Sequence, residues 1–184
     1  MGMGAGSRLS KGPGMSGYKP SQRRVRVDLL AIAGWISGTL HVPFKNSALA
    51  TFNRKSEFLP MTDASAAPGE PPIHFLAMRR SAIVLAVPSE EELERPVAPQ
   101  LGTHAHLNVR FHLHDITVEG TVEALASLRI SDFLETNPGF VVMSDCTLDE
   151  GGDVSSFSQL IVNTAHVLAV TEVHVGDRKV LVGV

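Results

Sequence analysis

The sequence has one cysteine, few aromatic residues and no long hydrophobic run. A single cysteine, Cys146, excludes an intramolecular disulfide and a zinc site built from cysteines, and its apolar flanks are typical of a small buried side chain. No stretch reaches the roughly 18–20 apolar residues of a helical membrane span. The N-terminus also lacks the apolar core of a signal peptide. We therefore expect a cytoplasmic protein without a membrane span.

Motifs that mark common catalytic and cofactor sites are missing as well. No Gly-x-Gly-x-x-Gly or phosphate-binding loop joins a strand to a helix. The serines Ser37, Ser131 and Ser144 lack the Gly-x-Ser-x-Gly elbow that presents a hydrolase nucleophile. We therefore expect no cofactor and no enzymatic activity.

Acidic residues are absent from the first 26 positions, which contain six basic residues. The net charge of −3 thus conceals an asymmetry, because the rest of the chain has ten basic and nineteen acidic residues. A basic arm on an acidic body is able to contact nucleic acid or an anionic membrane. A solvated tail is the favoured interpretation, since residues 1–22 are rich in glycine, have no apolar period and are predicted to be disordered.

What the chain does contain is an internal repeat. Residues 36–40 (Ile-Ser-Gly-Thr-Leu) recur as 118–122 (Val-Glu-Gly-Thr-Val), and residues 76–83 recur in the same order as 160–167. Two matched blocks in one order indicate a duplication. We predict a disordered basic arm over 1–22, a first β module over 23–88, an acidic, Pro-containing linker over 89–104, a second β module over 105–171 and a C-terminal β-hairpin over 172–184.

Each repeat shows the pattern of short strands. Apolar residues alternate at 25, 27 and 29 and again at 107, 109 and 111, which predicts strands with one buried face. Each unit reads as strand, strand, helical turn, strand, loop, strand, tight turn, strand. We therefore predict a mainly β fold of two tandem five-stranded small barrels, each with a short helical insert, because closure removes exposed edges. Phe58 and Phe140 are expected to anchor the cores, and Ser131 to cap the second insert.

A glycine and an aspartate recur at the same spacing in each module. Asp63 and Asp145 each follow the repeated glycine, Gly38 or Gly120, by the same interval. The glycines predict a close backbone approach or a bend. The aspartates are interpreted as acceptors of backbone hydrogen bonds at strand ends. A pair of carboxylates between the modules is the alternative.

Both repeated blocks resemble signatures of the Sm-like proteins. The alternating strand that leads to residues 36–40 resembles their first signature, and residues 79–83 (Arg-Arg-Ser-Ala-Ile) resemble the Arg-Gly-x-x-Ile of the second. Arg80 stands where that signature has glycine, Asn163 and Thr164 replace Arg-Gly in the second module, and the helical insert replaces the RNA-contacting Asp-x-x-x-Asn turn. The resemblance implies tandem small barrels and binding of single-stranded RNA through Arg79, Arg80 and Asn163.

The paired form is also similar to an uncharacterised bacterial family with an Arg-Leu-Ser-Asp-Phe-Leu-Asn-like turn, here residues 129–135. This resemblance covers residues 24–87 and 107–170 and implies no activity. His112 and His114, which are two positions apart on one strand, are weak candidates for metal ligands. No third ligand is visible, and Arg110 on the same face opposes a cation, so a solvated or partner-facing surface is favoured.

The absence of a convergent catalytic set favours a non-enzymatic protein-interaction or assembly module, with single-stranded RNA binding as the alternative. Two partly open barrels leave edge strands that proteins cover, charge or use for pairing. We expect Val42, Leu85 and Val87 to lie beside such edges. The sequence therefore predicts self-association, most simply as a two-fold dimer, or binding of a protein partner.

Overall fold

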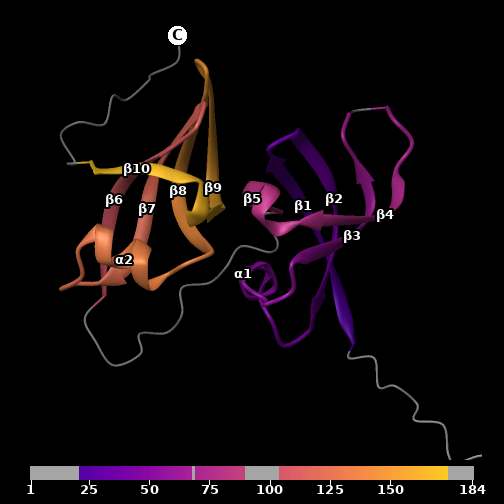
Figure 1. The fold of residues 1–184 in the computed structure, drawn as a ribbon, viewed down its shortest axis with the longest axis horizontal. Helices are drawn as coiled ribbons and strands as arrows, with labels where there is room; N and C mark the ends of the chain where they lie inside the picture. The colour runs from indigo at the N-terminus through magenta and orange to yellow at the C-terminus, as the bar shows by residue number, and fades with distance from the viewer. Residues whose placement is uncertain (1–20, 68, 90–103, 174–184) are drawn as a thin grey trace, which may run out of the picture.

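The computed structural model describes residues 21–67, 69–89 and 104–173. These residues form ten strands and two short helices, so the prediction of a mainly β fold is confirmed (Figure 1). The strands are β1 (Gln22–Ala31), β2 (Gly34–Pro43), β3 (Phe58–Ser65), β4 (Ile73–Arg79), β5 (Ile83–Pro88), β6 (His104–Leu113), β7 (Ile116–Leu125), β8 (Phe140–Glu150), β9 (Asp153–Asn163) and β10 (Val167–Glu172). The helices are α1 (Ala48–Phe52) and α2 (Ile130–Thr136), and the single 3-10 turns are η1 (Arg80–Ala82) and η3 (Thr164–His166).

The two halves of the described chain have the same order of elements and the same strand pairing. In the first half β1 pairs with β2 and β5, β2 with β3, and β3 with β4. In the second half β6 pairs with β7 and β10, β7 with β8, and β8 with β9. All strands belong to one open antiparallel sheet in the order β10-β6-β7-β8-β9-β5-β1-β2-β3-β4. The pairing closes neither half into a barrel.

The alternation read from the sequence determines which face of each first strand is buried. Val25, Val27 and Leu29 of β1 point into one core, whereas Val109, Phe111 and Leu113 of β6 point into the other. Side chains of a strand alternate between the two faces of the sheet, so the residues between these are more exposed. The predicted buried faces are therefore confirmed.

The repeated glycine and aspartate form a bulge that bends the sheet in each half. The pairing register shifts at Gly38 between β2 and β3 and at Gly120 between β7 and β8. Asp63 and Asp145 lie opposite these glycines with left-handed φ angles of 52° and 51°, a conformation that aspartate tolerates better than most residues. An extra residue on one strand increases the local twist. The identical spacing in the two halves is thus explained by the backbone, and the Asp63 carboxylate pairs with Arg24 at 2.6 Å.

Several details of the sequence prediction are wrong. Ser131 does not cap α2, because Arg129 occupies the N-cap and Ser131 lies inside the helix, where its hydroxyl contacts the Asp132 carboxylate. Phe140 is buried with 6% of its surface exposed, but Phe58 is 42% exposed and does not anchor a core. The first strand begins at Gln22, inside the segment predicted to be disordered. Residues 1–20, most of the predicted linker (90–103) and the part of the predicted hairpin after Val173 lie outside the described residues.

The expected edge positions are also wrong. Val42 and Leu85 are fully buried, and Leu85 and Val87 lie on β5, a central strand of the sheet. Leu85 and Val87 are not at an edge because β5 pairs with β9 of the other half, an arrangement that periodicity within one repeat does not reveal. Val42 lies on β2, which pairs with β1 and β3, and its side chain belongs to the first core.

Candidate functional site

The two halves are joined by the pairing of β5 with β9. Leu85 lies opposite Val162 and Ala86 opposite Ile161, and all four side chains are buried. Each core is completed by the other half, since Ile161 belongs to the first core and Leu85 to the second. We call this region the internal junction. A small β domain buries too little surface to be very stable alone, which explains why the halves share one sheet.

Polar side chains fasten the internal junction beside the paired strands. Asn53, at the end of α1, donates from Nδ2 to the Phe140 carbonyl and accepts the Phe140 N–H at Oδ1, both at 2.8 Å. Asn163, at the end of β9, donates to the Ile83 carbonyl at 2.8 Å. The Trp35 Nε1–H reaches across to the Glu150 carboxylate, 3.2 Å from each oxygen. The junction is therefore held by hydrogen bonds between the halves as well as by packed apolar side chains.

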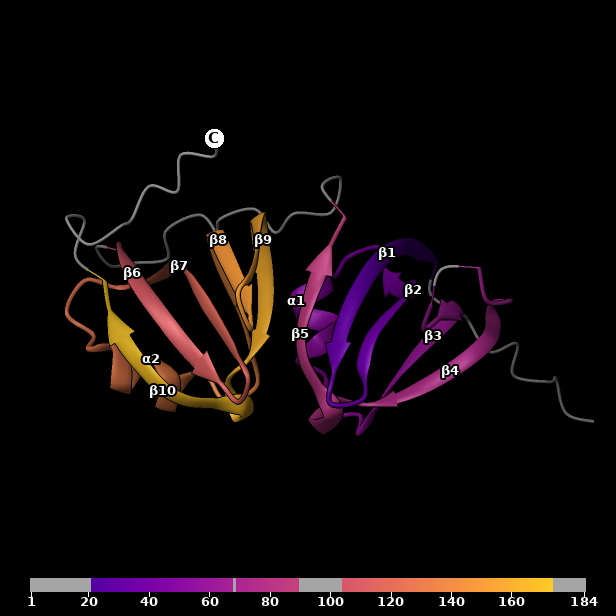
Figure 2. The same cartoon turned by 90° about the horizontal axis from the view of Figure 1, so that it is seen from above.

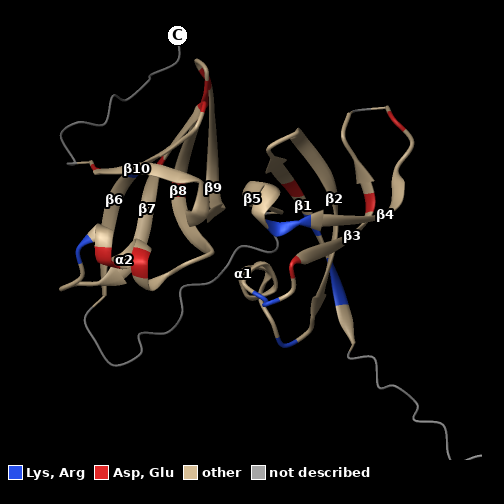
Figure 3. Cartoon of the chain, viewed as in Figure 1, with Lys and Arg blue, Asp and Glu red and all other residues tan. Residues whose placement is uncertain are grey.

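Among the described residues no strand pairs with the outer side of β4 or β10, so these two strands are the open edges of the sheet. They lie at opposite ends of the molecule, with β10 against β6 and β4 against β3 (Figure 2). Large apolar side chains are exposed on both edges, namely Ile73 and Phe75 on β4 and Leu168 on β10. Each edge strand has only one charged residue, Arg79 or Glu172, at its end (Figure 3). Natural edge strands are usually blunted by charge, proline or a covering segment, so these two edges are the strongest candidate binding surfaces.

The three residues predicted to bind RNA have different environments. Arg79 forms an exposed ion pair with Glu57 at 2.8 Å, and its guanidinium lies 5.3 Å from the centre of the Phe58 ring. Arg80 donates to the Thr51 carbonyl at 2.8 Å. Burial and, secondarily, the nearby charge of Arg54 lower the pKa of Arg80. Positive charge is therefore concentrated around η1.

Asn163 belongs to the internal junction. Only 3% of its surface is exposed, its Nδ2 lies 3.4 Å from the Arg80 carbonyl, and its Oδ1 accepts the Ala165 N–H. The structure thus brings Asn163 and Arg80 together, but the Asn163 side-chain amide already forms hydrogen bonds within the protein.

The histidine pair lies on and just after β6. His112 is opposite Thr117 of β7 and Ala169 of β10, and His114 is exposed in the turn that follows the strand. Arg110 on the same strand is paired with Glu119 at 2.7 Å. Within the described residues, no group of three or more His, Cys, Asp or Glu side chains is arranged to hold a metal ion. From these described residues the histidine pair gains no third ligand.

Cys146 is buried in the second core, as the sequence predicted. Burial is the main cause that raises the pKa of its thiol to about 12, and the charge of Asp145 adds to it. The thiol is therefore protonated at neutral pH. A protonated, buried thiol is a poor nucleophile.

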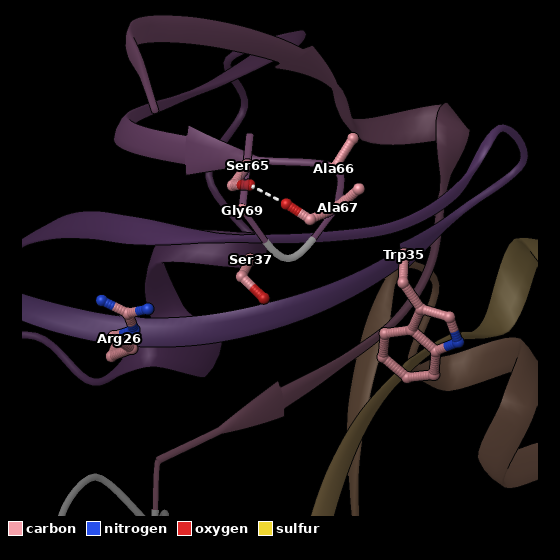
Figure 4. A pocket seen from close by; sticks show the side chains of 7 residues that line it. All are labelled: Arg26, Trp35, Ser37, Ser65, Ala66, Ala67 and Gly69. Atoms are coloured by element: carbon pink, nitrogen blue, oxygen red, sulfur yellow. Dashed lines mark hydrogen bonds between the residues drawn. The ribbon is translucent and has the colours of Figure 1, made fainter. Parts of the chain in front are cut away.

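An open pocket of about 420 Å³ lies between β1, β2 and the loop after β3 (Figure 4). Its polar groups are Arg26, Ser37, Ser65 and the edge of Trp35, and small residues of the loop complete it. Ser65 donates to the Ala67 carbonyl at 2.8 Å, and the Trp35 N–H is engaged by Glu150. The pocket has one cation and no general base beside a nucleophile, so its lining does not form a catalytic set.

Sequence reasoning missed the residues that make the junction and the edges. Asn53 has a counterpart at the end of α2, Asn137, but nothing in the sequence indicates that Asn53 binds the other half. Phe75 and Leu168 lie in short apolar runs that read equally well as central strands. Their low charge is typical of central strands, so nothing in the sequence marks either strand as an edge.

No protein-family model matches the chain, and neither a curated protein nor a solved structure is similar to it. Among the described residues, no helix is long and apolar enough to cross a membrane.

Proposed function

We propose that the chain is a non-enzymatic assembly module that binds protein by accepting a partner strand at an open sheet edge. The observation that carries this proposal is the exposure of apolar side chains on two nearly uncharged edge strands, with Phe75 64% and Leu168 71% exposed. An added strand gains main-chain hydrogen bonds along the edge and covers these side chains.

The proposal includes the predicted organisation of the chain as two tandem modules. The identical element order and pairing of the halves support two Sm-like barrel modules, each left open where a neighbour adds a strand. In this interpretation β9 serves as the added strand for the first module. The outer edges then serve the same purpose for partners.

The first test compares binding partners of the wild type with those of edge variants. The wild-type protein should retain partner proteins from a lysate, including further copies of the chain. The Phe75→Glu and Leu168→Lys variants should no longer retain them. They should be retained by the matched controls Phe44→Glu and Ile32→Lys, since Phe44 and Phe75 are both 64% exposed and Ile32 and Leu168 both 71%. Hydrolase and transferase screens of the same samples should give no turnover. Turnover that one substitution abolishes, with no edge-dependent partner, would overturn the proposal.

Single-stranded RNA binding is the second candidate, and the positive charge around η1 favours it. Phosphate contacts make such binding weaken steeply with salt. We expect oligo-U to bind at about 50 mM salt and to lose affinity several-fold in Arg79→Ala. Lys45→Ala, which removes an exposed cation from the turn after β2, is the control. Equal affinities of the two variants, or no binding at this salt concentration, would exclude an RNA site here.

A further inference from the structure

The open edges are repeats of the two strands that already pair inside the chain. β5 and β10 occupy the same place, because Ala86 lies opposite Leu29 of β1 and Val170 lies opposite Phe111 of β6. β9 and β4 correspond likewise, since Ile161 is opposite Val142 of β8 and Ala77 is opposite Pro60 of β3. β10 is therefore structurally equivalent to β5, and β4 is structurally equivalent to β9.

Burial differs at three of the four corresponding positions in the way that a missing partner predicts. Met78, like its counterpart Val162, is buried because it faces the core of its own half. Leu85 and Ala86 of β5 are fully buried, whereas their counterparts on β10, Ala169 and Val170, are exposed and half-buried. Ile161 of β9 is fully buried, whereas its counterpart Ala77 on β4 is exposed.

The same difference extends to the residues that begin β3 and β8. Phe140 is buried at the internal junction, and its counterpart Phe58 is 42% exposed beside the open edge. The residues of the two edge strands thus occupy the same positions as the residues of the internal junction, but no partner strand covers them within the described chain.

We propose that β10 of one copy pairs antiparallel with β4 of a second copy, repeating the internal junction between chains. This inference rests on the proposed function and names the partner as the chain itself. Transferring the internal register places Val170 opposite Ala77 and Ala169 opposite Met78. Continued along the strands, it places Leu168 opposite Arg79 and Glu172 opposite Phe75.

The contact is head to tail, because it joins two different edges. Each copy contributes one β4 and one β10, and these lie at opposite ends of the molecule (Figure 2). A heterologous contact leaves an open edge at each end of the assembly unless the last copy meets the first. The assembly is therefore a closed ring if the rotation between copies closes and an open chain if it does not, and it differs from a two-fold dimer through two like edges.

Light scattering on a size-exclusion column tests the contact. At about 100 μM, where mass action favours association, we expect the wild type at a multiple of 19.7 kDa. Phe75→Glu sets a carboxylate opposite Glu172, and Leu168→Lys sets an ammonium opposite Arg79. Like charges directly opposite oppose strand pairing, so each variant alone should be a 19.7 kDa monomer. The controls Phe44→Glu and Ile32→Lys should assemble as the wild type does.

Mixing the two edge variants gives the decisive result. The Phe75→Glu protein keeps an intact β10 and the Leu168→Lys protein an intact β4, so one junction forms between them. We expect a one-to-one complex of twice 19.7 kDa that does not grow further. A monomeric wild type, self-association of either variant alone, or a mixture that stays monomeric would each overturn the proposal. Melting curves equal to the wild type show that the exposed substitutions leave the fold intact.

Oxidative crosslinking checks the register. Ala77→Cys combined with Val170→Cys should give disulfide-linked multimers that a reductant dissolves, because the two positions face each other across the contact. The buried Cys146 does not interfere. The off-register pair Ala77→Cys with Leu168→Cys should crosslink at least about tenfold less, since disulfides need Cα atoms roughly 4.4–6.8 Å apart. Equal yields would overturn the register. If the wild type is monomeric but an edge-dependent partner is captured from lysate, this inference fails and the proposed function stands.

Discussion

Replacing Gly120 by valine is expected to lower the free energy of unfolding by about 3 kcal/mol, since overpacking a tight site typically costs 1–3 kcal/mol or more. A Cβ at Gly120 would lie 3.0 Å from both the Ser144 carbonyl oxygen and the Cys146 sulfur, and 3.4 Å from the Cys146 Cα. Backbone atoms of β8 cannot move aside without disturbing the bulge. The melting temperature should fall by about 6–12 °C for a chain of this size.

Alanine at the two repeated glycines supplies the control. A Cβ at Gly38 would meet the Met61 Cε at 2.7 Å, but this is the end of a flexible side chain, and the nearest backbone atom, the Ala64 Cα, is 3.4 Å away. Gly38→Ala should therefore be tolerated better than Gly120→Ala, as compared by thermal melting. An unchanged melting temperature in Gly120→Val would show that the strands are not held this closely.

Replacing Asn163 by alanine is expected to destabilise the fold by about 2–3 kcal/mol, because unsatisfied buried polar groups cost about 1–3 kcal/mol each. The substitution removes the donor to the Ile83 carbonyl at 2.8 Å and the acceptor of the Ala165 N–H at 3.1 Å. Both contacts lie at the internal junction. Denaturant unfolding measures the loss as a lower midpoint at an unchanged slope.

Asn137→Ala is the matched control. Asn137 is an exposed asparagine at the end of α2, and its side-chain amide donates to the Phe133 carbonyl and the Thr136 hydroxyl within its own turn. We expect a loss below about 1 kcal/mol there, since local bonds of exposed groups are replaced by water. Equal stability of Asn163→Ala and the wild type would contradict a structural role and leave the amide available for base recognition.

The repeat and the buried faces were accessible from the sequence because they depend on local periodicity. Alternation at 25, 27 and 29 reports the side of a strand that is apolar, and the copy at 107, 109 and 111 reports the same for the second half. The common spacing of Gly38 and Asp63 and of Gly120 and Asp145 indicated that both halves have the same backbone feature at this point. Only the structure showed that the feature is a β-bulge with an aspartate at a left-handed φ angle.

The neighbour of each strand was decided only by the tertiary structure. Leu85 and Leu168 both lie in apolar strands of similar composition, yet one is fully buried and the other 71% exposed, because β9 covers β5 and no described strand covers β10. The sequence pattern predicts that Asn163 is a polar turn residue. In the structure it is buried, and its amide donates a hydrogen bond to the carbonyl of Ile83, 80 positions earlier in the chain. Periodicity records the face of a strand and not what lies beside it, since pairing between distant segments depends on how both cores close together.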